Sequence, residues 1–136
     1  MADPHPNLIF VYNADGGVLN AVKDAVHKVA MPATYPCSLC ALTYGWVSMN
    51  SNWRRFLSSL PHTKVFHHRD DFAVAFPDLS PALPVIMLAE GKTPPRVLIS
   101  ADELDAMPDL ASLMALVEER LMLARLGAPI MPVSAD

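Results

Sequence analysis

Short β-rich runs, bounded by turn-forming residues, recur along this chain and predict the strands of a sheet. Four such runs stand out, at residues 8–12, 64–68, 85–89 and 96–99. The first is an unbroken apolar stretch, L-I-F-V-Y, which is typical of a strand buried on both faces. The third is entered through Leu83-Pro84. We therefore expect a sheet of about four strands.

Apolar residues that recur every three or four positions predict helices between these strands. We expect helices over 18–29, 34–45, 50–60 and 70–76, a short one opened by residues 100–103, and a long one from 109 to 124. Side chains that accept bonds from free backbone N–H groups precede several of them. Asp15, Asn50 and Asp109 stand where N-caps belong, and Ser100 with Glu103 forms a capping-box pattern.

Composition and length indicate one folded unit. The chain has 136 residues, of which 52% are hydrophobic and 18% charged. This is enough apolar surface for one core and too little chain for two ordinary domains. We expect a single α/β domain over residues 7–126, with its central sheet flanked by helices, and flexible ends at 1–6 and 127–136.

The charge pattern argues against two classes of partner. The net charge is −4, and Arg54-Arg55 is the longest basic run. A phosphate backbone or an anionic membrane attracts a positive surface, so we expect neither nucleic acid nor membrane as a partner. Residues 1–6 lack the pattern of a signal peptide, and we expect a cytoplasmic protein.

The two cysteines of the chain, Cys37 and Cys40, are three positions apart in the segment Y-P-C-S-L-C-A-L-T-Y-G at residues 35–45. Cytosolic Cys-x-x-Cys pairs are more often catalytic, redox-sensing or metal-binding than permanent crosslinks. Free cysteines also serve as small buried apolar residues. The spacing leaves all three interpretations open.

The order strand, helix, strand, helix, strand, strand, helix, with Pro84 just before the third strand, resembles the thioredoxin-like fold. In that family a cis-proline at this point faces the active site. The resemblance covers roughly residues 7–125 and makes residues 31–61 a helical insertion, carrying the cysteines, after the first helix. More narrowly, the Y-x-C-x-L-C-A-L-T-Y-G segment resembles a group of short, poorly characterised bacterial proteins.

This resemblance implies thiol–disulfide exchange or redox sensing, with protein thiols or a small thiol as partners. A position near a helix N-terminus favours the thiolate form, so we expect Cys37 to attack, Cys40 to resolve, and their sulfurs to be open to water. Pro84 is the expected contact with a substrate backbone.

An alternative is a non-enzymatic metal-binding or protein-interaction module that uses the same cysteines. Structural zinc takes four nitrogen or sulfur ligands, which Cys37, Cys40, His27 and His67 supply by count. Copper(I) accepts the two thiolates alone. Strand alternation sends His67 and His68 to opposite faces of their strand.

Asn13 and Asp15 follow the first strand, at the edge where open α/β sheets place their ligands. They are candidates for binding a small polar ligand. Turn formation and helix capping also account for both residues.

Overall fold

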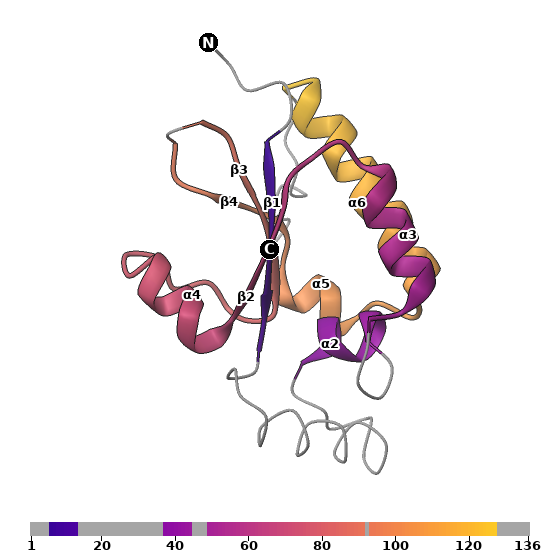
Figure 1. Cartoon of the computed structure of the whole chain (residues 1–136), viewed down its shortest axis with the longest axis horizontal. Helices are drawn as coiled ribbons and strands as arrows, with labels where there is room; N and C mark the ends of the chain where they lie inside the picture. Colours follow the sequence, from indigo (N-terminus) through magenta and orange to yellow (C-terminus); the bar gives the residue numbers. More distant parts are fainter. Residues whose placement is uncertain (1–5, 14–36, 45–48, 92, 128–136) are drawn as a thin grey trace.

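The computed structural model describes residues 6–13, 37–44, 49–91 and 93–127. Four strands form one sheet in the described structure, and helices lie on both of its faces (Figure 1). The strands are β1 (Asn7–Tyr12), β2 (Lys64–His68), β3 (Val85–Ala89) and β4 (Arg96–Ile99). The helices are α2 (Ser38–Thr43), α3 (Ser51–Ser59), α4 (Arg69–Ala75), α5 (Ala101–Asp105) and α6 (Leu110–Arg125).

The sheet has the strand order β2-β1-β3-β4. Strands β1 and β2 are parallel, with Phe10 opposite Phe66. Strand β3 runs antiparallel to β1, with Ile86 opposite Phe10, and β4 runs antiparallel to β3. The two apolar runs of the sequence thus occupy the centre of the sheet, because a central strand has both its edges paired and both its faces covered.

Alternate residues of β1 enter two different cores. Leu8, Phe10 and Tyr12 belong to the main core, which also contains side chains of α2, α3 and α6. Ile9 and Val11 point to the other face and pack with Phe72 of α4. Of the helices that the structure describes, Figure 1 shows α4 on one side of the sheet and the others on the opposite side. This is the period-two alternation of a strand that is buried on both faces.

Helix α3 is held by its cap and by one large side chain. The Asn50 Oδ1 accepts hydrogen bonds from the N–H groups of Asn52 and Trp53, at 2.8 and 3.3 Å. Trp53 is fully buried and meets the ring of Phe10 edge-on, with 5.8 Å between the ring centres. The helix therefore packs directly on the sheet.

The long helix α6 begins at the Asp109 cap, whose Oδ1 accepts from the Ser112 N–H at 2.8 Å. Gly127 follows the helix with a positive φ of 76°, a conformation that glycine adopts without a steric penalty. Among the described residues, no helix combines the length and the apolar character needed to cross a membrane.

The α/β class and the four strands predicted from the sequence are confirmed, as are the helices over 50–60, 70–76, 100–103 and 109–124, each within a few residues. One boundary differs. The expected helix over 34–45 is seen as α2, in which Cys37 is the extended N-cap residue instead of a helical one. The helix expected over 18–29 lies outside the described residues. So do the flexible ends expected at 1–6 and 127–136, apart from Pro6 and Gly127.

Candidate functional site

Cys37 and Cys40 form a disulfide, and their Cα atoms are 5.2 Å apart. Cys37 precedes α2 and Cys40 lies in its first turn. One helical turn brings residues three apart onto the same side, and their Cα separation falls within the usual range for a disulfide. The local fold of this segment therefore accounts for the pairing.

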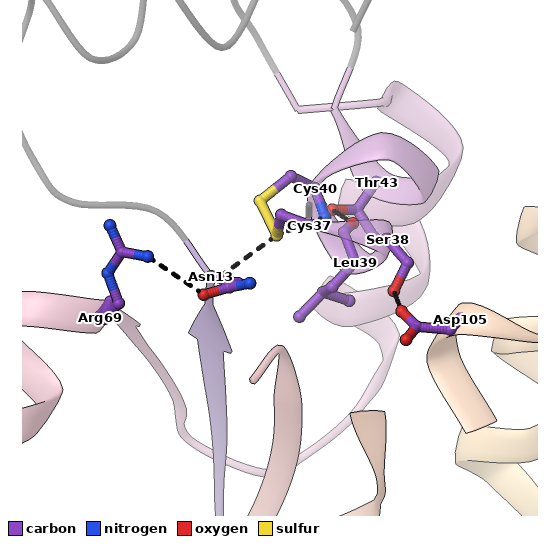
Figure 2. Close-up of a disulfide and its surroundings, with 8 residues drawn as sticks. All are labelled: Asn13, Cys37, Ser38, Leu39, Cys40, Thr43, Arg69 and Asp105. Carbon is purple, nitrogen blue, oxygen red and sulfur yellow. Dashed lines mark hydrogen bonds between the residues drawn. A yellow bond between two sulfur atoms is a disulfide. The ribbon is translucent and has the colours of Figure 1, made fainter. Parts of the chain in front are cut away.

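The Cys37 sulfur accepts two backbone hydrogen bonds (Figure 2). One comes from the Cys40 N–H at 3.2 Å, within the same turn. The other comes from the Asn13 N–H at 3.3 Å, and Asn13 is 24 residues away in the sequence. Because Asn13 directly follows β1, this contact holds the disulfide at the carboxyl end of a central strand.

Several chain segments reach the same end of the sheet. Tyr12 at the end of β1 pairs with His68 at the end of β2, and Val11 pairs with Val85 at the start of β3. Pro84, one residue before Val85, is buried at this end as well. The Leu83-Pro84 peptide bond is cis. The cysteine pair and Pro84 thus lie at one end of neighbouring strands.

Two polar contacts surround the disulfide in Figure 2. The Arg69 guanidinium, at the start of α4, donates a long 3.5 Å hydrogen bond to Asn13 Oδ1. The Ser38 hydroxyl donates to Asp105 Oδ1 at 2.7 Å and so joins α2 to α5. The first contact links Asn13 to α4 on one face of the sheet, and the second links α2 to α5 on the other face.

The expectation that the sulfurs are open to water is wrong. Cys37 is 1% exposed and Cys40 is 9% exposed, and both belong to the main core. Leu39 and Thr43 are fully buried beside them, and the Thr43 hydroxyl donates to the Leu39 carbonyl at 2.7 Å. The helix is only six residues long, and three of its side chains, Leu39, Cys40 and Thr43, are buried.

Tyr12 precedes Asn13 and is almost fully buried. Burial, together with the neighbouring Tyr44, raises the pKa of the Tyr12 phenol far above its ordinary value of 10. The phenol therefore stays neutral at physiological pH and brings no negative charge to the end of β1.

The structure does not bring His67 to the cysteines. Its imidazole faces α4, where it contacts Phe72 and Phe76 and makes a 3.0 Å hydrogen bond with Asp71 Oδ2. The cysteines lie in the core on the opposite side of the sheet. Within the described ranges no group of three or more His, Cys, Asp or Glu residues could hold a metal ion. His27 lies outside those ranges.

Asn13 contributes to the candidate site through its main chain as well as through its side chain. Its main-chain N–H bonds to Cys37, and its side chain accepts from Arg69. Asp15, its expected partner in ligand binding, lies outside the described residues. Sequence reasoning missed Arg69, Ser38 and Asp105, because no local pattern relates residues that meet only after the sheet forms.

No protein-family model, curated protein or solved structure matches this chain. Membership of the thioredoxin-like superfamily, and of the bacterial group with the Y-x-C-x-L-C-A-L-T-Y-G segment, therefore stays a prediction from the sequence. The geometry around the disulfide is therefore the basis for inferring a function.

Proposed function

We propose that this chain is a thioredoxin-like protein whose Cys37–Cys40 pair passes between disulfide and dithiol, in thiol–disulfide exchange or redox sensing. The observation that carries the proposal is the hydrogen bond from the Asn13 N–H to the Cys37 sulfur. It ties the cysteine pair to the carboxyl end of β1, the edge at which open α/β sheets bind and transform their ligands.

Two features of the fold support the thioredoxin-like part of the proposal. With α2 and α3 taken together, and α5 with α6, the described elements run strand, helix, strand, helix, strand, strand, helix. Pro84 stands directly before β3, at the end of the sheet that also holds the disulfide. These are the features on which the resemblance to that family rests.

The size of the disulfide loop favours a redox role over a structural one. The cysteines have a sequence separation of only 3, and the stabilisation from a crosslink grows with the length of the loop it closes. For so short a loop the expected contribution is roughly 2 kcal/mol, well below that of a crosslink between distant segments. Helix α2 already holds the two residues close together.

Partners of this pair would be protein thiols or a small thiol, and we keep the cytoplasm as the proposed compartment. Cellular reductants there keep most thiols reduced, so a disulfide between Cys37 and Cys40 would form and break as the protein works. The side chain of Pro84 is buried, and a contact with a substrate backbone at this position would involve the main chain.

The alternative function, a zinc or copper module on the same cysteines, needs both sulfurs as thiolates. In the structure they are bonded to each other, and His67 faces the other core. No observation favours the metal module over redox exchange, but a single set of measurements distinguishes the two.

The test compares reduced and oxidised full-length protein with a Cys37→Ala variant. Thiols are titrated without denaturant after equilibration in buffers of increasing dithiothreitol, and bound zinc and copper are measured on the same samples. We expect two thiols to appear per chain, to disappear on reoxidation, and to do so with no metal bound. Circular dichroism of each sample checks that the chain remains folded.

Two results would overturn the proposal. If the thiols react only in denaturant, the pair is an inert part of the core. If zinc or copper binds stoichiometrically and is lost in Cys37→Ala, the metal module is the better account.

A further inference from the structure

The outer face of α6 carries exposed apolar side chains. The helix buries Leu113, Val117 and Arg120 against the rest of the molecule. On the opposite side of the helix, Met122 is 53% exposed, and Leu126, directly after the last helical residue, is 70% exposed. These two side chains are one helical turn apart, so they form a single apolar patch on the surface.

Small side chains extend this patch along the helix. Ala115 and Ala111 are exposed and stand seven and eleven residues before Met122, which places all three on the same side of the helix. A cavity of about 490 Å³ borders the patch, with Leu121 and Met122 of α6 and Leu88 of β3 in its lining. The short alanine side chains leave room for the longer side chains of a second helix.

Two opposite charges lie beside the patch. Glu118 and Arg125 are exposed, line the same cavity and are seven residues apart, with Met122 between them. Neither side chain has an ion-pair partner among the described residues. Two helical turns separate them by roughly 10 Å along the helix axis, too far for a strong mutual attraction in water. The patch therefore has a negative end and a positive end.

This arrangement is complementary to itself. A two-fold axis across α6 near Met122 reverses the direction of the helix in a second copy. Glu118 of one copy then lies opposite Arg125 of the other, and the same pair occurs twice, because a two-fold interface uses one surface on both copies. Met122 meets its counterpart at the axis, and Leu126 lies over Ala115 of the second copy.

We propose that the chain associates with a second copy of itself through this face of α6, with the two helices antiparallel. A second copy fits because it presents the same two charges in reverse order together with a matching apolar patch. The contact goes beyond the redox function and does not involve the cysteines. Since one helix of each copy makes the contact, the interface is small, and the dimer dissociates on dilution.

The first test uses charge reversal. Sedimentation equilibrium of the full-length protein over a series of concentrations gives the Kd of the dimer. Glu118→Arg or Arg125→Glu alone places like charges opposite each other at both contacts, and we expect each variant to raise the Kd by roughly tenfold or more.

An equal mixture of the two variants is the matched control. One copy then carries arginine at both positions and the other carries glutamate at both, so every contact across the two-fold axis is attractive again. We expect a mixed dimer whose Kd is within about threefold of that of the unaltered protein. Fluorescent labelling of one variant distinguishes the mixed dimer in a sedimentation velocity experiment.

A second pair of variants tests the apolar patch. Met122→Asp puts a charge at the two-fold axis, whereas Val74→Asp makes the same change of charge at another exposed apolar residue, on α4. We expect the dimer to be lost in Met122→Asp and unchanged in Val74→Asp. Circular dichroism checks that both variants are folded.

Three results would overturn the inference. A Kd weaker than about 1 mM for the unaltered protein would mean that the face binds no second copy. A dimer that survives both charge reversals, or that Val74→Asp weakens as much as Met122→Asp does, would use another surface. A mixture that fails to restore the dimer would exclude the antiparallel arrangement. The thiol titration is a separate measurement, so a monomer with reversible thiols would leave the proposed function intact.

Discussion

At the scale of single residues, an aromatic contact in the main core joins a helix to the sheet. Trp53 of α3 is fully buried and packs against Phe10 of β1 and Phe56 of its own helix. A large side chain at such a position stabilises the fold in two ways: its apolar surface is removed from water, and its volume fills space that would otherwise be a cavity. The same face of the sheet carries the disulfide, so loss of this contact affects the support of the site.

Trp53→Ala is expected to lower the free energy of unfolding by about 3–5 kcal/mol, because it removes a buried ring and leaves a cavity. Denaturant titration followed by circular dichroism measures the change. Arg54→Ala, at the exposed neighbouring position, serves as the control and should stay within about 0.5 kcal/mol of the unaltered chain. A loss below about 1 kcal/mol in Trp53→Ala would mean that the core closes over the gap.

At the scale of elements, a buried ion pair joins α6, α5 and β4. The Arg120 guanidinium donates to the Leu98 carbonyl at 2.9 Å and to Glu103 Oε1 at 3.1 Å, and a second ion-pair contact joins it to Glu103 Oε2. Arg120 is only 6% exposed. Burial alone would raise the pKa of Glu103, but the hydrogen bonds from Arg120 and Ser100, together with the guanidinium charge, hold that pKa below its ordinary value.

Glu103→Gln is expected to destabilise the protein by about 2 kcal/mol at neutral pH, since the buried Arg120 charge loses the Glu103 carboxylate. The usual cost of 3–5 kcal/mol is reduced because the Glu103 side chain is 23% exposed. Urea titration measures the difference, and Glu119→Gln, on the exposed side of α6, is the control.

The pH dependence of this pair has a definite sign. A carboxyl whose pKa is lower in the folded chain stabilises it fully above the ordinary pKa of 4.5, and that stabilisation is lost as the pH falls through the lower folded value. The gap in stability between the unaltered chain and Glu103→Gln should therefore shrink from about pH 7 to about pH 3. A gap that is the same at both values would show that the charge of Glu103 is not what stabilises the contact.

At the scale of the whole molecule, stability is expected to be uneven across the sheet. Strands β1 and β3 are central and almost fully buried, whereas β2 is an edge strand with exposed positions, including Phe66 at 39%. Regions with fewer buried contacts open locally at lower cost in free energy. The end of the sheet that carries the disulfide combines both kinds of strand.

Native-state hydrogen exchange tests this difference. We expect the slowest amides in β1 and β3, with protection close to the global free energy of unfolding, and faster exchange in β2 and α4. Only amides that are hydrogen-bonded to a neighbouring strand are compared, so that the strands differ in burial and in their position in the sheet. Equal protection in β2 and β1 would mean that the sheet opens only as a unit.

Local patterns predicted much of this architecture. The apolar runs at Leu8–Tyr12 and Val85–Leu88 became central strands, since an unbroken apolar segment has to be covered on both faces. The caps at Asn50, Ser100 and Asp109 also formed as expected, because a cap involves residues only two or three positions apart. Arg120 was not anticipated as a buried charge, because its partner Glu103 is 17 residues away.

Periodicity and short-range contacts were enough to predict the α/β class, the strands and helices of the described ranges, and a cysteine pair whose spacing permits a disulfide. The packing of distant segments placed the pair at the end of β1 next to Asn13, buried both cysteines, and turned His67 toward the other core. Those properties arise when distant segments pack on a common sheet, and side-chain burial there depends on neighbours that no local pattern specifies.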